Sequence, residues 1–349
     1  MASLSSAAPE QQRVAFFGDA FVDVQTSPMA SLPAYGEDRV VNSVSIFPGG
    51  SVVNTARSFA ALTQSDSVSV SLCVSLGSDH LGNIMLSVLE QERSIDLTHV
   101  NVCNNVPMST CLVLVGPGGD RAFVSTRGTS NDMSNAALCE ASGLLDSCTH
   151  VHVSGLFSTM GLQTKDFVQL LRRKKGAFGF TLSLDTQYDA TEKWTGDEDV
   201  VLDLIRLADV FMPNDAECKG ICRAHAKADA LLDVEESSLA WLMEAAPDTL
   251  IVVKVGPDGA IVGRQGVMHK VPTPMKITPE QCVDTCGAGD AFAAAMLSRW
   301  VIGSKSIAPD SVDLLDAVKK GCLAGTWCCT RVGACARPVT AEDLESESV

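Results

Sequence analysis

The sequence from residue 284 to 296 reads Asp284-Thr285-Cys286-Gly287-Ala288-Gly289-Asp290, followed by Ala291-Phe292-Ala293-Ala294-Ala295-Met296. The glycines at 287 and 289 let the backbone come close to a ligand, and a helix of small residues is predicted to begin directly after them. The unpaired N–H groups and the positive dipole end of that helix would face the glycine turn. This pattern indicates a site for a phosphate group whose negative charge shifts during transfer.

Asp290, at the same turn, has two interpretations. An aspartate at a helix start is often only an N-terminal cap, and an isolated Gly-x-Gly-Asp segment would favour that interpretation. Here Asp284 lies six residues earlier, and the small side chains after Asp290 would let the helix pack closely and aim its end. We therefore favour the interpretation in which Asp290 accepts a proton from an attacking hydroxyl group.

Six short, largely apolar segments are predicted to form strands, with helical stretches between them. The segments are Val14–Phe17, Val68–Leu76, Val151–Val153, Phe180–Leu184, Val210–Met212 and Leu250–Val255. This alternation is typical of an α/β fold with a doubly wound, mostly parallel sheet covered by helices on both faces. The alternating segments near 25–47 and 106–125 do not fit that sheet and predict a small β lid, with a hairpin around the loop 116–120.

The composition limits the classes of partner. Of 349 residues, 46% are hydrophobic and 19% charged, which supplies a sizeable core. The net charge of −16 disfavours nucleic acid and anionic membranes, so a phosphate ligand must be held by local groups. No apolar run approaches the ~18 residues of a membrane span, and residues 1–12 lack the apolar core of a signal peptide. We expect a cytoplasmic protein without membrane or nucleic-acid partners.

The 13 cysteines do not predict a disulfide framework, because their number is odd and they are spread along the chain. No pair forms a Cys-x-x-Cys motif, so reduced thiols in a cytosol-like compartment fit better. Cys218, Cys222 and His225 could share a helical face as metal ligands, but a fourth ligand is not evident. Ordinary side chains are the favoured interpretation there.

Two segments resemble the signatures of a known family. The segment Asp284–Asp290 resembles the C-terminal signature of the ribokinase-like (PfkB) family of carbohydrate and nucleoside kinases. The segment Gly49-Gly50-Ser51-Val52-Val53-Asn54-Thr55-Ala56 resembles its N-terminal signature, a Gly-Gly pair with Asn four residues on. Segments 77–82, 214–217 and 254–260 are also similar to family segments, so the resemblance covers residues ~13 to ~340.

The resemblance implies a ribokinase-like α/β core with a β-sheet lid, and ATP-dependent phosphorylation of an alcohol, usually a hydroxymethyl group. The implied divisions are a core of residues 13–24, 48–105 and 127–340, a lid of 25–47 and 106–126, and flexible termini 1–12 and 341–349. The exposed strand edges of the lid suggest a homodimer, since some family members pair their lids.

The resemblance also implies roles for individual residues. It matches Asp290 with the catalytic base and Gly287, Ala288 and Gly289 with the anion hole. The substrate contacts that it implies are Asp23, Gly49, Gly50 and Asn54. Asn214 and Glu217 match the motif that organises Mg²⁺ through water, and Lys254, Gly256 and Gly259 are assigned to the nucleotide. Asp284 and Cys286 lie where many family members bind a monovalent cation such as K⁺ through carbonyl groups.

Three positions depart from the ribokinase pattern and leave the substrate open. Ser51 stands where ribokinases commonly have a Lys, and Ser154 follows the strand that commonly leads to a sugar-binding Glu. Gln187 and Asp189 replace the Asn and Arg of the Asp-x-Asn-x-Arg stretch of many sugar kinases. These departures put ribose in doubt, although they do not affect the prediction of phosphoryl transfer to a sugar or sugar acid.

Other functions fit less well. A nicotinamide oxidoreductase needs a second glycine in the turn Gly18–Asp23, and a P-loop needs Lys after Gly82. A catalytically inactive relative is disfavoured because the signature residues are all present. An adenosine-type nucleoside kinase is the alternative to a sugar kinase. It needs apolar surface for a base, but aromatic residues are only 5% of the chain, and Phe47 and Phe123 could equally be lid core.

Overall fold

The computed structural model describes residues 11–64, 68–116, 121–131, 140, 142–226, 235–333 and 336–346. Its main element is a nine-stranded sheet with the order β15-β14-β13-β12-β11-β10-β1-β4-β6. The strands from β13 to β6 are parallel, and β14 and β15 are antiparallel. Their bounds are β1 Gln12–Gly18, β4 Val68–Cys73, β6 Ile95–Asp96, β10 His150–Ser154, β11 Thr181–Asp185, β12 Val210–Phe211, β13 Leu250–Lys254, β14 Ala260–Arg264 and β15 Val267–Val271.

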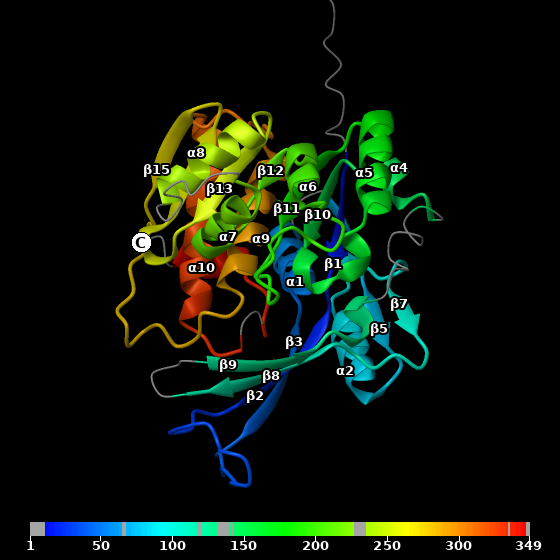
Figure 1. The fold of residues 1–349 in the computed structure, drawn as a ribbon, viewed down its shortest axis with the longest axis vertical. Helices are drawn as coiled ribbons and strands as arrows, with labels where there is room; N and C mark the ends of the chain where they lie inside the picture. Colours follow the sequence, from blue (N-terminus) through cyan, green and yellow to red (C-terminus); the bar gives the residue numbers. More distant parts are fainter. Residues whose placement is uncertain are drawn as a thin grey trace, which may run out of the picture.

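Helices cover both faces of this sheet (Figure 1). One face packs against α1 Ser51–Leu62, α2 His80–Gln91, α9 Ala288–Ile302, α10 Val312–Cys329 and α11 Ala341–Ser346. The other packs against α4 Leu144–Ser147, α5 Lys165–Phe178, α6 Val201–Leu207, α7 Asp215–His225 and α8 Glu235–Ala245. Successive strand residues alternate between the two cores, as Phe16 and Phe17 do, which explains the continuous apolar runs. The predicted fold class is confirmed.

The lid is a separate four-stranded sheet with the order β3-β2-β8-β9. Its strands are β2 Phe21–Thr26, β3 Val44–Gly49, β8 Thr110–Val115 and β9 Arg121–Thr126. Figure 1 shows this sheet projecting below the main sheet, with β3 leading back towards α1. The strands of the predicted hairpin are present, while residues 117–120 of its loop lie outside the described residues. A further pair, β5 Ser75–Gly77 and β7 Asn101–Cys103, lies beside α2.

Several local predictions were wrong. β2 begins at Phe21, so Asp23 lies on a lid strand and not at the end of a main-sheet strand. Ser51 was expected to cap α1, but Gly50 is the N-cap, with φ 93°, and Ser51 is the first helical residue. The tail expected to be frayed is helical from 341 to 346, because Leu344 packs into the core. Residues 1–10 and 347–349 lie outside the described part of the chain.

Within that described part, no helix is both long enough and apolar enough to cross a bilayer. Four single 3-10 turns complete the elements and lie at Gly128–Asn131, Leu156–Ser158, Met160–Leu162 and Gly256–Asp258. The last of these turns follows β13, at the carboxyl edge of the parallel strands.

Candidate active site

Polar side chains gather where neighbouring parallel strands end. Ser154 and Asp185 are the last residues of β10 and β11, and Lys254 is the last residue of β13. Asp19 follows β1, and Asn214 follows β12 and pairs with Lys254 through an isolated bridge. The carboxyl ends of parallel strands are where open α/β sheets bind ligands. The N-termini of α1 and α9 contribute to the same edge through contacts between their side chains.

Asp290 lies in the first turn of α9 and is buried. Its Oδ1 accepts hydrogen bonds from Ser51 Oγ at 2.8 Å and Gln187 Nε2 at 3.2 Å, and its Oδ2 accepts one from Asn54 Nδ2 at 2.9 Å. Burial raises the pKa of Asp290 to about 6, although the bonds from Asn54 and Ser51 act in the opposite direction. Its carboxyl group is therefore held in one orientation and titrates near neutral pH.

The start of α9 presents N–H groups to this cleft. Gly287 is the N-cap with φ 72°, a left-handed conformation that favours glycine. The Ala288 amide donates to the Thr285 carbonyl at 3.3 Å. Among the described residues, the amides of Gly289 and Asp290 have no acceptor. Two donors at a helix start are thus available to an anion.

Lys254 supplies a cation beside that helix start. Its Nζ lies 3.3 Å from the position that a Cβ on Gly289 would take, and it forms a 2.6 Å ion pair with Asp185. Both side chains are buried, with 11% and 1% exposure. Burial alone would lower the pKa of Lys254, but the nearby carboxylates of Asp185 and Glu217 outweigh burial and raise it. Lys254 therefore stays charged although its side chain is largely buried.

Asn214 and Glu217 form a capping box at the start of α7. Glu217 accepts bonds from the Asn214 backbone N–H at 2.9 Å and from its Nδ2 at 2.7 Å. Burial raises the pKa of Glu217 to about 7, although the charge of Lys254 lowers it. Both residues thus have a structural role, and the Glu217 carboxylate also lies close enough to the Lys254 ammonium group to feel its charge.

Asp23 and Asn54 face the cleft with open acceptor atoms. In the described part of the chain, no group donates a hydrogen bond to the Asp23 carboxylate, and Asn54 Oδ1 is buried without a partner. A Cβ on Gly49 would come within 2.5 Å of Asp23 Oδ2, so a larger residue where β3 passes this carboxyl group would displace the carboxyl group. Burial and the charges of Asp290 and Asp284 raise the pKa of Asp23 to about 7. These acceptors suit a ligand that donates hydrogen bonds.

Asp284 connects three segments of the site. Its carboxylate accepts bonds from the amides of Cys286 at 2.7 Å and Gly333 at 2.9 Å, and it pairs with Arg121 of lid strand β9 at 2.8 Å. Its oxygens are therefore already engaged, so a monovalent cation here would depend on backbone carbonyls. Ala334, which was expected to share that region, lies outside the described residues.

The two glycines assigned to the nucleotide form the turn between β13 and β14. Gly256 has φ 59°, and a Cβ on it would meet no atom within 4 Å. Gly259 has φ 98°, and a Cβ there would lie 2.2 Å from the Val271 carbonyl oxygen. Gly259 is thus fixed by the fold itself, whereas Gly256 borders open space.

Sequence reasoning missed the roles of four contributors to the site. Asp19 is buried, and its Oδ1 accepts a 3.2 Å bond from the Val52 amide at the start of α1. Arg121 pairs with Asp284, but no sequence pattern predicts this contact, because arginine is common in exposed hairpins. Ser154 and Gln187 were noted only as departures, although both contact Ser51. Cys218, Cys222 and His225, for which ordinary side chains were the favoured interpretation, belong to no group of potential metal ligands among the described residues.

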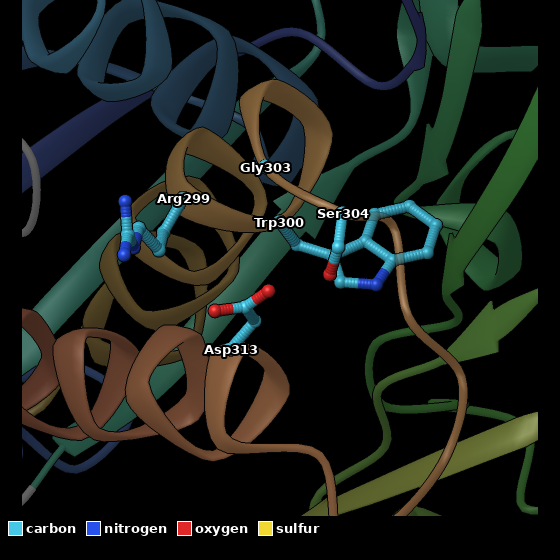
Figure 2. A pocket seen from close by; sticks show the side chains of 5 residues that line it. All are labelled: Arg299, Trp300, Gly303, Ser304 and Asp313. Carbon is cyan, nitrogen blue, oxygen red and sulfur yellow. The ribbon is translucent and has the colours of Figure 1, made fainter.

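A pocket of about 220 Å³ lies elsewhere, between the end of α9 and the start of α10 (Figure 2). It is lined by Arg299, Trp300, Gly303, Ser304 and Asp313. Trp300 is roughly 15 Å from Asp290 along the helix axis, at 1.5 Å per residue. This pocket is therefore separate from the cleft at the helix start.

The fold and the cleft define a doubly wound α/β protein that can hold an anion beside a buried carboxyl group. A model of the pfkB family of carbohydrate kinases matches residues 11–341. The chain belongs to this family and is a kinase.

Known relatives agree with this assignment. An adenosine kinase of Dictyostelium discoideum is 25% identical over 279 residues, 78% of each chain. An ATP-dependent ribose-1-phosphate kinase of Halopiger xanaduensis is 27% identical over 256 residues, 72% of this chain and 73% of that protein. A ribokinase of Arabidopsis thaliana solved with ribose and ATP has a TM-score of 0.73 at 19% identity, covering 97% of this chain and 98% of that one, which supports the fold.

Proposed function

We propose that this kinase transfers the γ-phosphate of ATP to a hydroxymethyl group of a sugar or sugar acid. The observation that carries the proposal is the buried Asp290 beside two open amides at the start of α9, with the Lys254 ammonium group next to Gly289. Amides and a cation stabilise charge on a transferring phosphate, and the carboxylate supplies a proton acceptor. A catalytically inactive relative would not need the carboxylate, the open amides and the ammonium group in one place.

In the proposed reaction, the acceptor hydroxyl lies against Asp23, Gly49, Gly50 and Asn54 with the lid over it. Its oxygen attacks the γ-phosphorus in line, its O–H bond breaks with the proton passing to Asp290, and the bond from the γ-phosphorus to the bridging oxygen of ADP breaks. The N–H groups of the 287–290 turn hold the phosphate oxygens during transfer. The lid excludes water, which limits wasteful hydrolysis of ATP.

Mg²⁺ fits the acidic donors near Lys254, and a solved neighbour from E. coli holds ATP and Mg²⁺. Glu217 and Asn214 would hold the ion through water, and when bound it would neutralise phosphate charge. We assign Gly256, which borders open space, to the nucleotide side of the cleft. A K⁺ ion near Asp284 and Cys286 would be bound by backbone carbonyls.

A nucleoside kinase is the second candidate, and Phe47 favours it. Phe47 pairs directly with Asp23 across β2 and β3, so the ring and the carboxyl group lie on the same face of the lid. The ring also lies 2.9 Å from the position of a Cβ on Gly333. An aromatic ring beside a diol-binding carboxylate would suit a base attached to ribose.

We also propose a homodimer through the outer face of the lid. Val24 pairs with Ile46 and Leu112, and Leu112 pairs with Val124, so these side chains share the face opposite Asp23. Ile46, Leu112 and Val124 are 41–57% exposed, which makes an apolar row across four strands. Such a row is typical of a contact surface.

The test is an ADP-release assay with ATP and Mg²⁺ over pentoses, hexoses, keto-deoxy acids and nucleosides. We expect one sugar to give turnover, and Asp290→Asn to reduce kcat by about 10³-fold or more with ATP binding retained. A nucleoside as the best acceptor would establish the second candidate. Near-normal kcat in Asp290→Asn would refute the assignment of the base, and no turnover with any acceptor would refute the proposed activity.

A further inference from the structure

Three side chains without an assigned role form a hydrogen-bond network that ends at one oxygen of Asp290. Ser51 Oγ donates to Asp290 Oδ1 at 2.8 Å, and Gln187 Nε2 donates to the same oxygen at 3.2 Å. Gln187 Nε2 also lies 2.8 Å from Ser51 Oγ, and Ser154 Oγ lies 2.5 Å from Ser51 Oγ. Ser51 and Ser154 are buried and Gln187 is half-buried, so water does not easily replace these contacts.

The donor count fixes the direction of this network. A serine hydroxyl has one hydrogen to donate and two lone pairs that accept. An ionised carboxylate can only accept, so the single Ser51 hydrogen points to Asp290 Oδ1. Ser51 must then accept from both Gln187 and Ser154, and the Ser154 hydrogen points to Ser51. The chain therefore runs from Ser154 to Ser51 to Asp290, with Gln187 donating beside it.

The two oxygens of Asp290 are consequently unequal. Oδ1 receives two donors, which fill its two lone-pair positions, whereas Oδ2 receives one donor from Asn54. We propose that Ser51, Ser154 and Gln187 are positioning residues. Ser51 and Gln187 occupy Oδ1, Ser154 orients Ser51, and the open lone pair of Oδ2 is left to receive the proton of the acceptor hydroxyl. The proposal rests on the proposed function. In that step the acceptor O–H bond breaks and an O–H bond forms at Oδ2.

Gln187 is itself anchored by charged groups. Its backbone has φ 61°, its backbone N–H donates to Asp185 Oδ1 at 3.3 Å, and Asp185 Oδ2 is held by Lys254. The Lys254–Asp185 ion pair thus holds Gln187 in place, and Gln187 in turn holds the Asp290 carboxyl group. At Ser51, a neutral donor network takes the place of the lysine that ribokinases commonly have. Neutral donors favour the ionised form of Asp290 without adding a charge to the cleft.

The test is the pH dependence of kcat in Ser51→Ala and Gln187→Ala. Removing a donor to the ionised carboxylate raises the pKa of Asp290, so the acid limb of the profile should move up by about one pH unit. A shift of that size lowers kcat about fivefold near pH 6 and hardly at all near pH 8. The charged groups around Asp290 are unchanged in these variants: Asp19, Asp23, Asp185, Glu217 and Lys254.

Matched controls are available in the chain. Gln265→Ala removes an exposed glutamine that also has a left-handed backbone, with φ 50°, and Ser304→Ala removes an exposed serine. Neither should shift the profile. Gln187→Glu keeps the side-chain size but places a carboxylate against Asp290, so it should shift the limb further than Gln187→Ala. A loss of kcat that is equal at both pH values would overturn the positioning role.

A second measurement needs no acceptor. The protonation of Asp290 can be followed by infrared difference spectra of the substrate-free protein during a pH titration, with Asp290→Asn identifying the band. We expect the midpoint to rise in Ser51→Ala and Gln187→Ala and to stay fixed in Gln265→Ala. An unmoved midpoint would refute the network even if the kinase is active. A moved midpoint would support it even if every tested acceptor fails, which separates this inference from the proposed function.

Discussion

Replacing the central carboxylate should stabilise the protein at neutral pH. Burial raises the pKa of Asp290 from 3.8 to about 6, so the folded state binds a proton more tightly than the unfolded state. Below about pH 4 both states are protonated and the group costs nothing. Between about pH 4 and pH 6 the unfolded state loses this proton while the folded state keeps it, so the cost grows with pH. Above pH 6 it reaches about 3 kcal/mol, for a difference of about two pKa units. Asp290→Asn removes this cost.

The hydrogen bonds around the substituted residue can adapt. The amide oxygen can still accept from Ser51 and Gln187, as Oδ1 does now. Its NH₂ group would face the Asn54 NH₂, but Asn54 Oδ1 is buried without a partner. A rotation of the Asn54 carboxamide turns that oxygen towards the new donor and satisfies both groups. The change in volume is negligible, so no cavity offsets the electrostatic gain.

The assay is thermal unfolding of the full chain at several pH values. A gain of about 3 kcal/mol corresponds to about 4 °C in Tm for a chain of this length at pH 8, and about half of that gain should remain near pH 5. Asp310→Asn is the matched control, because Asp310 is exposed and has no hydrogen bond or ion pair with any residue that the structure describes. A lower Tm for Asp290→Asn at pH 8, or a gain that does not depend on pH, would refute the reasoning.

Two further perturbations test other parts of the molecule. Lys254→Met should destabilise the protein by about 3–5 kcal/mol in urea unfolding, because it leaves Asp185 buried and unpaired. Adding Asp185→Asn should recover part of that loss, and no recovery would contradict the buried-pair argument. Ile46→Glu should convert a lid-paired dimer to a monomer in sedimentation velocity, whereas Phe178→Glu, which alters an equally exposed apolar residue on α5, should not. A monomeric parent chain would rule out the dimer itself.

The sheet was predictable because its strands are buried on both faces. Runs such as Val14–Phe17 and Leu250–Val253 are apolar at every position, since alternate side chains enter two different cores. The helix start at Asp290 was predictable for a similar local reason. Two glycines and a run of small residues are needed wherever a helix end must approach a ligand and pack closely against its neighbours.

The remaining site residues could not be predicted, because their partners are distant in sequence. Ser51 has the local character of a helix cap, but in the folded chain its hydroxyl donates to Asp290, 239 residues away. Arg121 finds Asp284 only because the lid folds over the helix start. Local propensity describes what a residue does alone, and tertiary contacts override it where strand ends and helix ends meet.

A chain with a net charge of −16 must hold the polyanion ATP by short-range contacts. In the cleft, the Lys254 ammonium group lies near the helix start, and Asp185 at 2.6 Å already cancels much of its long-range field. The pKa values of Asp23 and Asp290, raised to about 7 and about 6 respectively, reflect the same crowding of acidic groups away from water. The open amides of α9 act differently, since their dipoles are effective within a few ångströms and attract no anion from far away. Under the proposed function, phosphate binding depends on fit at the 287–290 turn, which would allow this kinase to combine an acidic surface with a phosphate site.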